Sequence, residues 1–194
     1  MDPRHEAIWR RATPLLGVRS NDVHTEYCYR FALALCAIHP EADAAVVLPA
    51  ILLHDIGWST VPTDRILESF GPRTRYPELR RQHEVEGARL ARHILAEVGH
   101  PSAQTEAIVQ IIDGHDTRDH ALSLEDGLVK DADKLWRYTP FGLETVRGWF
   151  GHDVETQLAL LEEWTRTRFF VDAARHMALG LLTGLRAELE VRRG

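Results

Sequence analysis

The segment "VLPAILLHDIGWSTVP", residues 47–62, joins an apolar run to two ionisable residues, His54 and Asp55. Gly57 interrupts the apolar pattern shortly afterwards, and Trp58 follows it. An imidazole and a carboxylate at the end of a buried segment cost free energy unless a partner compensates them. The sequence therefore predicts that His54 and Asp55 have a specific partner inside the fold.

Length and composition describe an ordinary globular chain. Its 194 residues fit one domain, residues 1–194, with enough chain to bury a core. A net charge of −6 argues against binding of a nucleic acid polymer, because such proteins present basic faces. A small phosphorylated ligand stays compatible with this charge, since it needs only a local cluster of cations.

Several sequence features bear on the location of the protein. Cys28 and Cys36 lie eight residues apart in one helical pattern, which favours two packed thiols over a disulfide. The charged segment "MDPRHEAIWRR", residues 1–11, is not a signal peptide, and no run of about 18 apolar residues predicts a membrane span. We therefore expect a soluble cytoplasmic protein with no membrane partner, and a homodimer is a further possibility that the sequence leaves open.

Apolar residues recur at spacings of three and four, which is typical of amphipathic helices. This pattern predicts helices over residues 24–39, 41–57, 81–99, 101–115 and 123–138, and one long helix or two between residues 154 and 190. Alternation with a period of two is absent beyond a few residues, so we predict an all-α fold, a single helical bundle. The segment 59–82 reads as a loop with one short helix near residues 64–70.

Local signals mark some of the helix ends. Ser20 and Asn21 are candidate caps of the first long helix, and Ser123 is the candidate cap of the helix over 123–138. Pro49 predicts a kink or a late start in the second helix, and Gly57 predicts its end.

Four of the eleven histidines stand near predicted helix ends, and an aspartate lies inside the helix over 123–138; these residues are His24, His54, His83, His115 and Asp133. Such ends can meet at one end of a bundle. Neutral imidazoles and carboxylates are together the ligand set of a first-row transition metal. A divalent cation would also compensate the buried charge of Asp55.

This order of residues resembles the HD-domain superfamily of metal-dependent phosphohydrolases. The resemblance covers about residues 20–140 and is carried by "HTEYCYRFALAL", "LLHDIGW", "HEVEGARLARHIL", "IIDGHD" and "KDADKLWRY". It implies a helical bundle with a metal site in its core, followed by C-terminal helices over residues 141–194. It also implies one or two divalent transition metals, with iron, manganese, cobalt, nickel and zinc all open.

The resemblance assigns the metal ligands residue by residue. One metal would be held by His24, His54, Asp55 and Asp133, and a second metal by His83 and His115, with Asp55 bridging the two. Asp131 competes with Asp133 for the last position of the first set. The family residue precedes a basic residue and Leu, as in "ADKL", which selects Asp133. Two positions correspond to roughly 200° around a helix, so both aspartates do not easily point inward.

The implied chemistry is phosphoester hydrolysis. A divalent metal lowers the pKa of bound water from 15.7 to about 7, and positioned cations offset the charge of the transferring group. Candidate cations are Arg73, Arg75, Arg80, Arg81, Lys130, Lys134 and Arg137. We predict that Asp55, Lys134 and Arg81 take part in catalysis, Lys134 because it adjoins the proposed ligand Asp133. Asp116, which follows His115, is either a ligand-supporting residue or an ordinary loop residue.

Trp58 departs from part of the family. Some relatives that cleave phosphodiesters carry Lys after the Ile-Gly pair and use it on phosphate, whereas this chain has Trp58 there. The indole could stack on a base, wall a pocket or belong to the core. Further along, "FGLETVRGWF" could supply Trp149 and Phe150 to a pocket wall or to a subunit contact.

Three functions stay open at this point. The leading one is a metal-dependent phosphohydrolase acting on a small phosphorylated substrate, with nucleotides among the candidates. The second is a di-iron oxygenase, because a few relatives use the same ligand set with dioxygen. The third is a non-catalytic ligand-binding or regulatory module.

Overall fold

The computed structural model describes residues 2–72 and 74–193. Within these residues the chain is helical and contains no strand, which confirms the all-α prediction. The α-helices are α1 (Pro3–Ala12), α2 (Asn21–Ile38), α3 (Ala44–Leu53), α4 (Pro77–Glu97), α5 (Ser102–Ile112), α6 (Leu124–Leu135), α7 (Pro140–Phe150), α8 (Val154–Thr167) and α9 (Asp172–Arg193). Short 3₁₀ helices are η1 (Thr13–Leu15), η2 (Ile56–Thr60), η3 (Thr63–Glu68) and η4 (Trp136–Tyr138).

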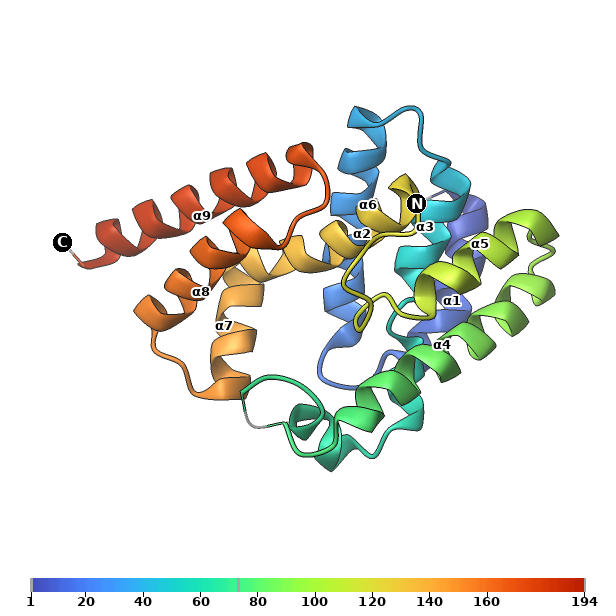
Figure 1. The fold of residues 1–194 in the computed structure, drawn as a ribbon, viewed down its shortest axis with the longest axis horizontal. Coiled ribbons are helices and arrows are strands. Elements are labelled where there is room, and N and C mark those ends of the chain that lie inside the picture. Colours follow the sequence, from blue (N-terminus) through green and yellow to red (C-terminus); the bar gives the residue numbers. More distant parts are fainter. Residues whose placement is uncertain (1, 73, 194) are drawn as a thin grey trace.

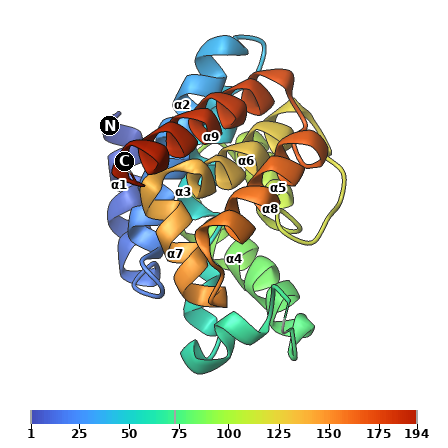
Figure 2. The same cartoon turned by 90° about the vertical axis from the view of Figure 1, so that its left-hand side faces the viewer.

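The helices form a bundle with α3 at its centre. Helix α3 contacts α1, α2, α5 and α6, and α4 packs along α5 and η2. Helices α7, α8 and α9 lie together on the side of the bundle opposite α4 and α5 (Figure 1). A view turned by 90° shows α9 running across α6 (Figure 2). One hydrophobic cluster extends from Ile8 in α1 to Leu185 in α9.

Helix α3 is the most buried helix of the bundle. Its first turn is capped by Asp43, whose Oδ1 accepts a hydrogen bond from the Ala45 amide at 2.8 Å. All residues from Val46 to Leu53 are buried. The predicted start of this helix at or after Pro49 was wrong, because α3 begins at Ala44 and Pro49 lies inside it. The expected end at Gly57 was also wrong, because the α-helix ends at Leu53 and the chain continues through η2.

Gly57 has a packing role that replaces the predicted stop. A Cβ atom at this position would lie 1.8 Å from the His83 carbonyl oxygen and 2.6 Å from the Gly87 amide nitrogen. Both contacts are with the backbone of α4, which cannot move aside as a flexible side chain would. Gly57 therefore allows α4 to lie directly against η2, and this contact brings His83 beside the His54–Asp55 pair.

The remaining helix predictions are largely confirmed. Ser123 caps α6 by accepting the Asp126 amide at 3.3 Å. Helix α2 begins at Asn21, after Ser20 in a left-handed conformation without a side-chain cap, so neither residue caps as predicted. The C-terminal region divides into two helices, α8 and α9, and the 59–82 segment carries the short helix η3. Helix α1 was not predicted, and α7 lies in the region 141–194 where C-terminal helices were expected.

Two further predictions concern cysteines and membranes. Both Cys28 and Cys36 are free thiols, which confirms the absence of a disulfide between them. Among the described residues, none of the helices combines the length and apolar character required to cross a bilayer.

The Gly57 contact predicts a large effect of adding one methyl group. Gly57→Ala should lower the free energy of unfolding by roughly 3 kcal/mol, because the new Cβ would overlap the α4 backbone. Urea unfolding followed by circular dichroism measures this difference. Gly180→Ala in α9 is the matched control, since its Cβ meets no atom within 4 Å and Ala favours the helix. A Gly57→Ala protein as stable as the parent would contradict the packing argument.

Candidate functional site

Six buried or half-buried side chains from five parts of the bundle meet beneath its surface; they are His24 of α2, His54 and Asp55 after α3, His83 of α4, His115 after α5 and Asp133 of α6. The sequence predicted this convergence at helix ends. Two positions differ in detail. Helix α4 begins at Pro77, so His83 lies in its second turn, and His115 stands three residues beyond the end of α5.

Three of these residues and one oxygen of Asp55 form a first donor group: His24, His54, Asp133 and Asp55 Oδ2. The Nε2 atoms of His24 and His54 are 3.0 Å apart. Asp55 Oδ2 lies 3.4 Å from His24 Nε2 and 3.7 Å from His54 Nε2. Asp133 Oδ1 lies at the same two distances, 3.4 and 3.7 Å, from these nitrogens. Four donor atoms therefore face one point.

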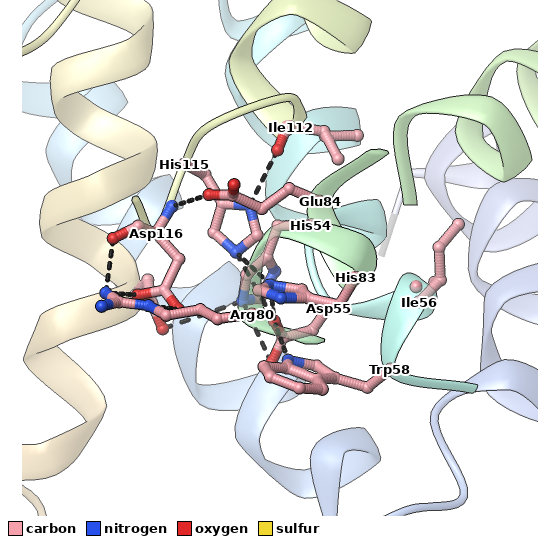
Figure 3. Close-up of polar contacts among 12 residues, drawn as sticks. His54, Asp55, Ile56, Trp58, Arg80, His83, Glu84, Ile112, His115 and Asp116 are labelled. Atoms are coloured by element: carbon pink, nitrogen blue, oxygen red, sulfur yellow. Dashed lines mark hydrogen bonds and ion pairs between the residues drawn. The ribbon is translucent and has the colours of Figure 1, made fainter. Parts of the chain in front are cut away.

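The other oxygen of Asp55 faces a second donor group: His83, His115 and Asp55 Oδ1 (Figure 3). Asp55 Oδ1 lies 3.5 Å from His115 Nε2 and 3.8 Å from His83 Nε2, and these two nitrogens are 3.5 Å apart. The Trp58 indole Nε1–H also donates to Asp55 Oδ1 at 3.0 Å. One carboxylate thus joins both groups.

Two of the imidazoles are oriented by backbone carbonyls. His54 Nδ1 lies 2.7 Å from Ile51 O, and His115 Nδ1 lies 2.9 Å from Ile112 O. A carbonyl only accepts, so each Nδ1 carries the proton of the bond. In the neutral ring the Nε2 lone pair then points into the cluster, which is the arrangement that metal-binding histidines use.

Burial controls the charge of the remaining groups. It lowers the pKa of His24 to about 3 and that of His83 to about 4, so both rings are neutral near pH 7. Burial alone would raise the pKa of Asp55, but the surrounding imidazoles outweigh it and hold that pKa well below its usual range. Burial opposes protonation of His115 and His54 as well, but the Asp55 carboxylate outweighs it, raising the pKa of His115 to about 9 and raising that of His54. A divalent cation bound at Nε2 would displace the proton that Asp55 favours there.

The spacing of the donors fits such an ion. Metal bonds to nitrogen and oxygen are about 2.0–2.2 Å long, so two donors on one ion lie roughly 3–3.6 Å apart. The nitrogen–nitrogen and nitrogen–oxygen distances within the first donor group are 3.0–3.7 Å. Those within the second are 3.5–3.8 Å. The buried cluster could therefore hold a metal ion.

Cys28 is a neighbour of the first donor group that the sequence did not suggest. Its Sγ lies 3.6 Å from His24 Nδ1 and 3.7 Å from His24 Nε2. Burial raises the pKa of this thiol, which therefore stays protonated. The sulfur is nearly equidistant from both ring nitrogens, and Cys28, His24, His54 and Asp133 offer donor atoms that all lie within 4.8 Å of one another.

Glu84 and the Arg80–Asp116 pair hold the turn that carries His115. The buried Glu84 carboxylate accepts the backbone amides of Asp116 and Thr117 at 2.8 and 2.7 Å. Arg80 donates to both carboxylate oxygens of Asp116 at 2.7 Å. Asp116 is thus a supporting residue of the turn, and Arg80, a candidate cation, is engaged with it.

Lys130 supports the same turn from α6. It is 3% exposed, and its Nζ donates to the carbonyl oxygens of Gly114, His115 and Arg118 at 3.0, 3.0 and 2.8 Å. All three ammonium protons are used, so Lys130 has none to offer a ligand. Its predicted place among the phosphate-binding cations is therefore replaced by a structural role.

The two aspartates of α6 point to different surroundings. Asp133 joins the first donor group, whereas Asp131 accepts the backbone amides of Phe170 and Val171, each at 2.9 Å. The Lys134 Nζ also lies 3.2 Å from Asp131 Oδ1. Asp131 therefore anchors the segment before α9, and the expectation that the two carboxylates diverge is met.

A cavity of about 850 Å³ opens beside the cluster, and His24, Asp55, His115 and Asp133 line it. Lys134 and Arg137 also line it. Arg81 does not, because it is bound to Glu84 and Asp113 at 2.9 and 2.5 Å outside the cavity. Arg75 is paired with Glu68 away from it, and Arg73 lies outside the described residues.

Aromatic residues form much of the cavity wall. Trp58 is 3% exposed and stacks on His83 with ring centroids 3.8 Å apart, which leaves little ring face for a base. Trp149 and Phe150 of α7 line the cavity, as one of the two sequence interpretations proposed. Trp164 of α8 and Phe170 also line the cavity.

Arg19 also lines the cavity, although no feature of the sequence indicated this. It lies in the short turn between η1 and α2, where an isolated arginine is an ordinary surface residue. No motif surrounds it, and only the folded chain brings it against the aromatic wall.

Comparison with known proteins gives one match. The sequence model of the HD domain matches residues 22–137, a segment that contains all six donor residues. Neither the curated proteins nor the solved structures include one that matches the chain.

The contacts of Lys130 predict a measurable loss of stability when its ammonium is removed. Lys130→Met keeps an apolar stem but leaves three buried carbonyls without their donor, which should cost about 2 kcal/mol. Thermal unfolding measures this as a drop of roughly 4–8 °C. The control Arg89→Met, at an exposed residue paired with Glu86, should change little. Equal melting temperatures for Lys130→Met and the parent would contradict the assigned role.

Proposed function

The chain belongs to the HD-domain family, and we propose that it is a metal-dependent phosphohydrolase acting on a small phosphorylated compound. One observation carries this proposal: the two oxygens of Asp55 face two separate groups of buried imidazoles. The cavity beside them supplies room for a substrate. We propose His24, His54, Asp55 and Asp133 as ligands of one divalent transition metal, and His83, His115 and Asp55 as ligands of a second.

The side chains have distinct parts in this proposal. A divalent metal supplies water with a pKa near 7, and hence hydroxide at neutral pH. Asp55 holds the two donor groups at a fixed separation, and Trp58 fixes the rotation of that carboxylate through its indole N–H. The carbonyls of Ile51 and Ile112 orient His54 and His115. Lys134 and Arg137 contribute positive charge to the cavity on its α6 side.

The cavity wall supports a substrate that combines an anion with an apolar part. Its aromatic side chains, Trp149, Phe150, Trp164 and Phe170, offer surface for a ring such as a nucleobase. A volume of about 850 Å³ lies within the range of small-ligand sites. Nucleotides are therefore first among the compounds to test.

Metal analysis tests the proposed ligands. Protein purified without chelator should contain one to two transition metal ions per chain, and His54→Ala and Asp133→Asn should lose most of this content. His93→Ala is the matched control, because His93 is exposed on α4, the helix that also carries His83. Metal-free parent protein that binds no added manganese, iron or cobalt would contradict the proposal.

Chelation should also lower stability. A metal present at 100 times its Kd stabilises the folded state by about 2.7 kcal/mol. For a chain of this length, its removal should lower the melting temperature by roughly 5–10 °C. Differential scanning calorimetry before and after chelation, with re-addition of manganese, measures the effect. An unchanged melting temperature in the parent, with unchanged metal content, would show only that the chelator failed, so both quantities are measured together.

Hydrolysis is tested directly with phosphate monoesters, nucleotides and phosphodiesters in the presence of manganese, iron or cobalt. At least one compound should be cleaved, and Asp55→Asn should reduce the rate by roughly a hundredfold or more. His93→Ala should leave the rate unchanged. Oxygen uptake by reduced, iron-loaded protein without hydrolysis would instead favour an oxygenase. A ligand that raises the melting temperature without turnover would favour a binding module.

A further inference from the structure

Arg19 is a partly buried cation without an anionic partner among the described residues. Its Nε atom is buried and has no hydrogen-bond partner, and no carboxylate lies within ion-pair distance of its guanidinium among the described residues. Burial lowers its pKa, but an arginine side chain stays protonated at neutral pH. An unpaired charge in such surroundings is costly unless a ligand compensates it.

Other buried or partly buried cations that line the cavity are already paired. Arg80 binds Asp116, Arg118 binds Asp126 and Lys134 binds Asp131. Arg137 contacts Asp133, and Lys130 donates to three carbonyls. Of the described cations that line the cavity and are at least partly buried, Arg19 is thus the one whose side chain makes neither a hydrogen bond nor an ion pair.

Three aromatic rings hold the guanidinium in place. Its central carbon lies 4.8 Å from the Trp58 ring centroid and 5.1 Å from those of Phe70 and Trp149. Such cation–π contacts attract the charge but satisfy none of the N–H donors in the guanidinium plane. The fixed, planar fork therefore remains available for a bidentate contact with an oxyanion.

The backbone that carries Arg19 is strained. Arg19 and Ser20 have φ values of 54° and 58°, and they are the described non-glycine residues with positive φ. Such conformations are unfavourable for residues with a Cβ and cluster at functional sites. Here they turn the Arg19 side chain inward, against the wall of the cavity.

Trp58 connects Arg19 to the donor groups. The same indole ring contacts the guanidinium, stacks on His83 and donates to Asp55. We propose that Arg19 binds an oxyanion of the substrate, a phosphoryl group or the inorganic phosphate released from it, beside the second donor group. This inference rests on the proposed function for the identity of the anion. Arg19 also lies outside residues 22–137, the segment that the HD-domain comparison matches.

Titration with inorganic phosphate tests the assignment without any turnover. Because Arg19 contacts Trp58 and Trp149, bound phosphate should change the tryptophan fluorescence of the parent protein. Arg19→Gln should raise the Kd for phosphate roughly 10- to 100-fold, and Arg19→Lys by less, since it keeps the charge and loses the fork. Arg65→Gln is the matched control, because Arg65 packs on Tyr76 outside the cavity; its Kd should equal that of the parent.

The outcomes separate this inference from the proposed function. Phosphate binding that depends on Arg19, in a protein that cleaves no phosphoester, supports the anion site and counts against hydrolysis. Cleavage with an unchanged KM in Arg19→Gln overturns the anion site and leaves hydrolysis intact. A Kd within twofold of the parent, or no phosphate binding by the parent, also overturns it. Arg19→Gln should melt no lower than the parent, and a drop of several degrees would assign Arg19 a structural role instead.

Discussion

The position of one buried carboxylate constrains the whole bundle. Asp55 is 8% exposed, and each of its oxygens faces a different set of imidazoles. These imidazoles and Asp133 come from five parts of the chain, and a shift of any one would leave a buried polar group without its neighbour. Buried charged side chains, Glu84 and Lys130 among them, accordingly form hydrogen bonds that hold the turn carrying His115 in place. Backbone groups in those turns have no regular secondary structure to satisfy them, so charged side chains do so.

Much of this arrangement follows from the sequence. The helical period of the apolar residues predicts the bundle, because a helix must bury its apolar stripe against other helices. The six donor residues were assigned because the order His, His-Asp, His, His, Asp along successive helices resembles the HD-domain pattern. The choice of Asp133 over Asp131 followed from the resemblance, through "ADKL", and helix geometry added only that residues two positions apart point in different directions.

The features that the sequence did not show depend on contacts between distant segments. In the sequence Gly57 indicates the end of a helix. Only the position of α4 shows that the absence of a side chain at Gly57 allows the two backbones to pack together. Lys130 and Lys134 look alike in the sequence, yet Lys130 donates to three carbonyls whereas Lys134 pairs with Asp131. Arg81 adjoins Arg80 but lies outside the cavity, because neighbouring helical residues diverge by about 100°. No sequence motif around Arg19 indicates that it lies at the cavity.

The cavity is lined both by residues of the segment 22–137 and by residues outside it, and the two sets can change independently in evolution. All six donor residues lie within residues 22–137, whereas Arg19 precedes this segment and Trp149, Trp164 and Phe170 follow it. Substitutions in the flanking segments can therefore reshape the wall while the donors keep their positions. This division allows selection to change ligand preference while the six donor residues stay in place. It also gives a protein engineer a defined set of positions, on α7, α8 and the segment before α9, for altering ligand preference.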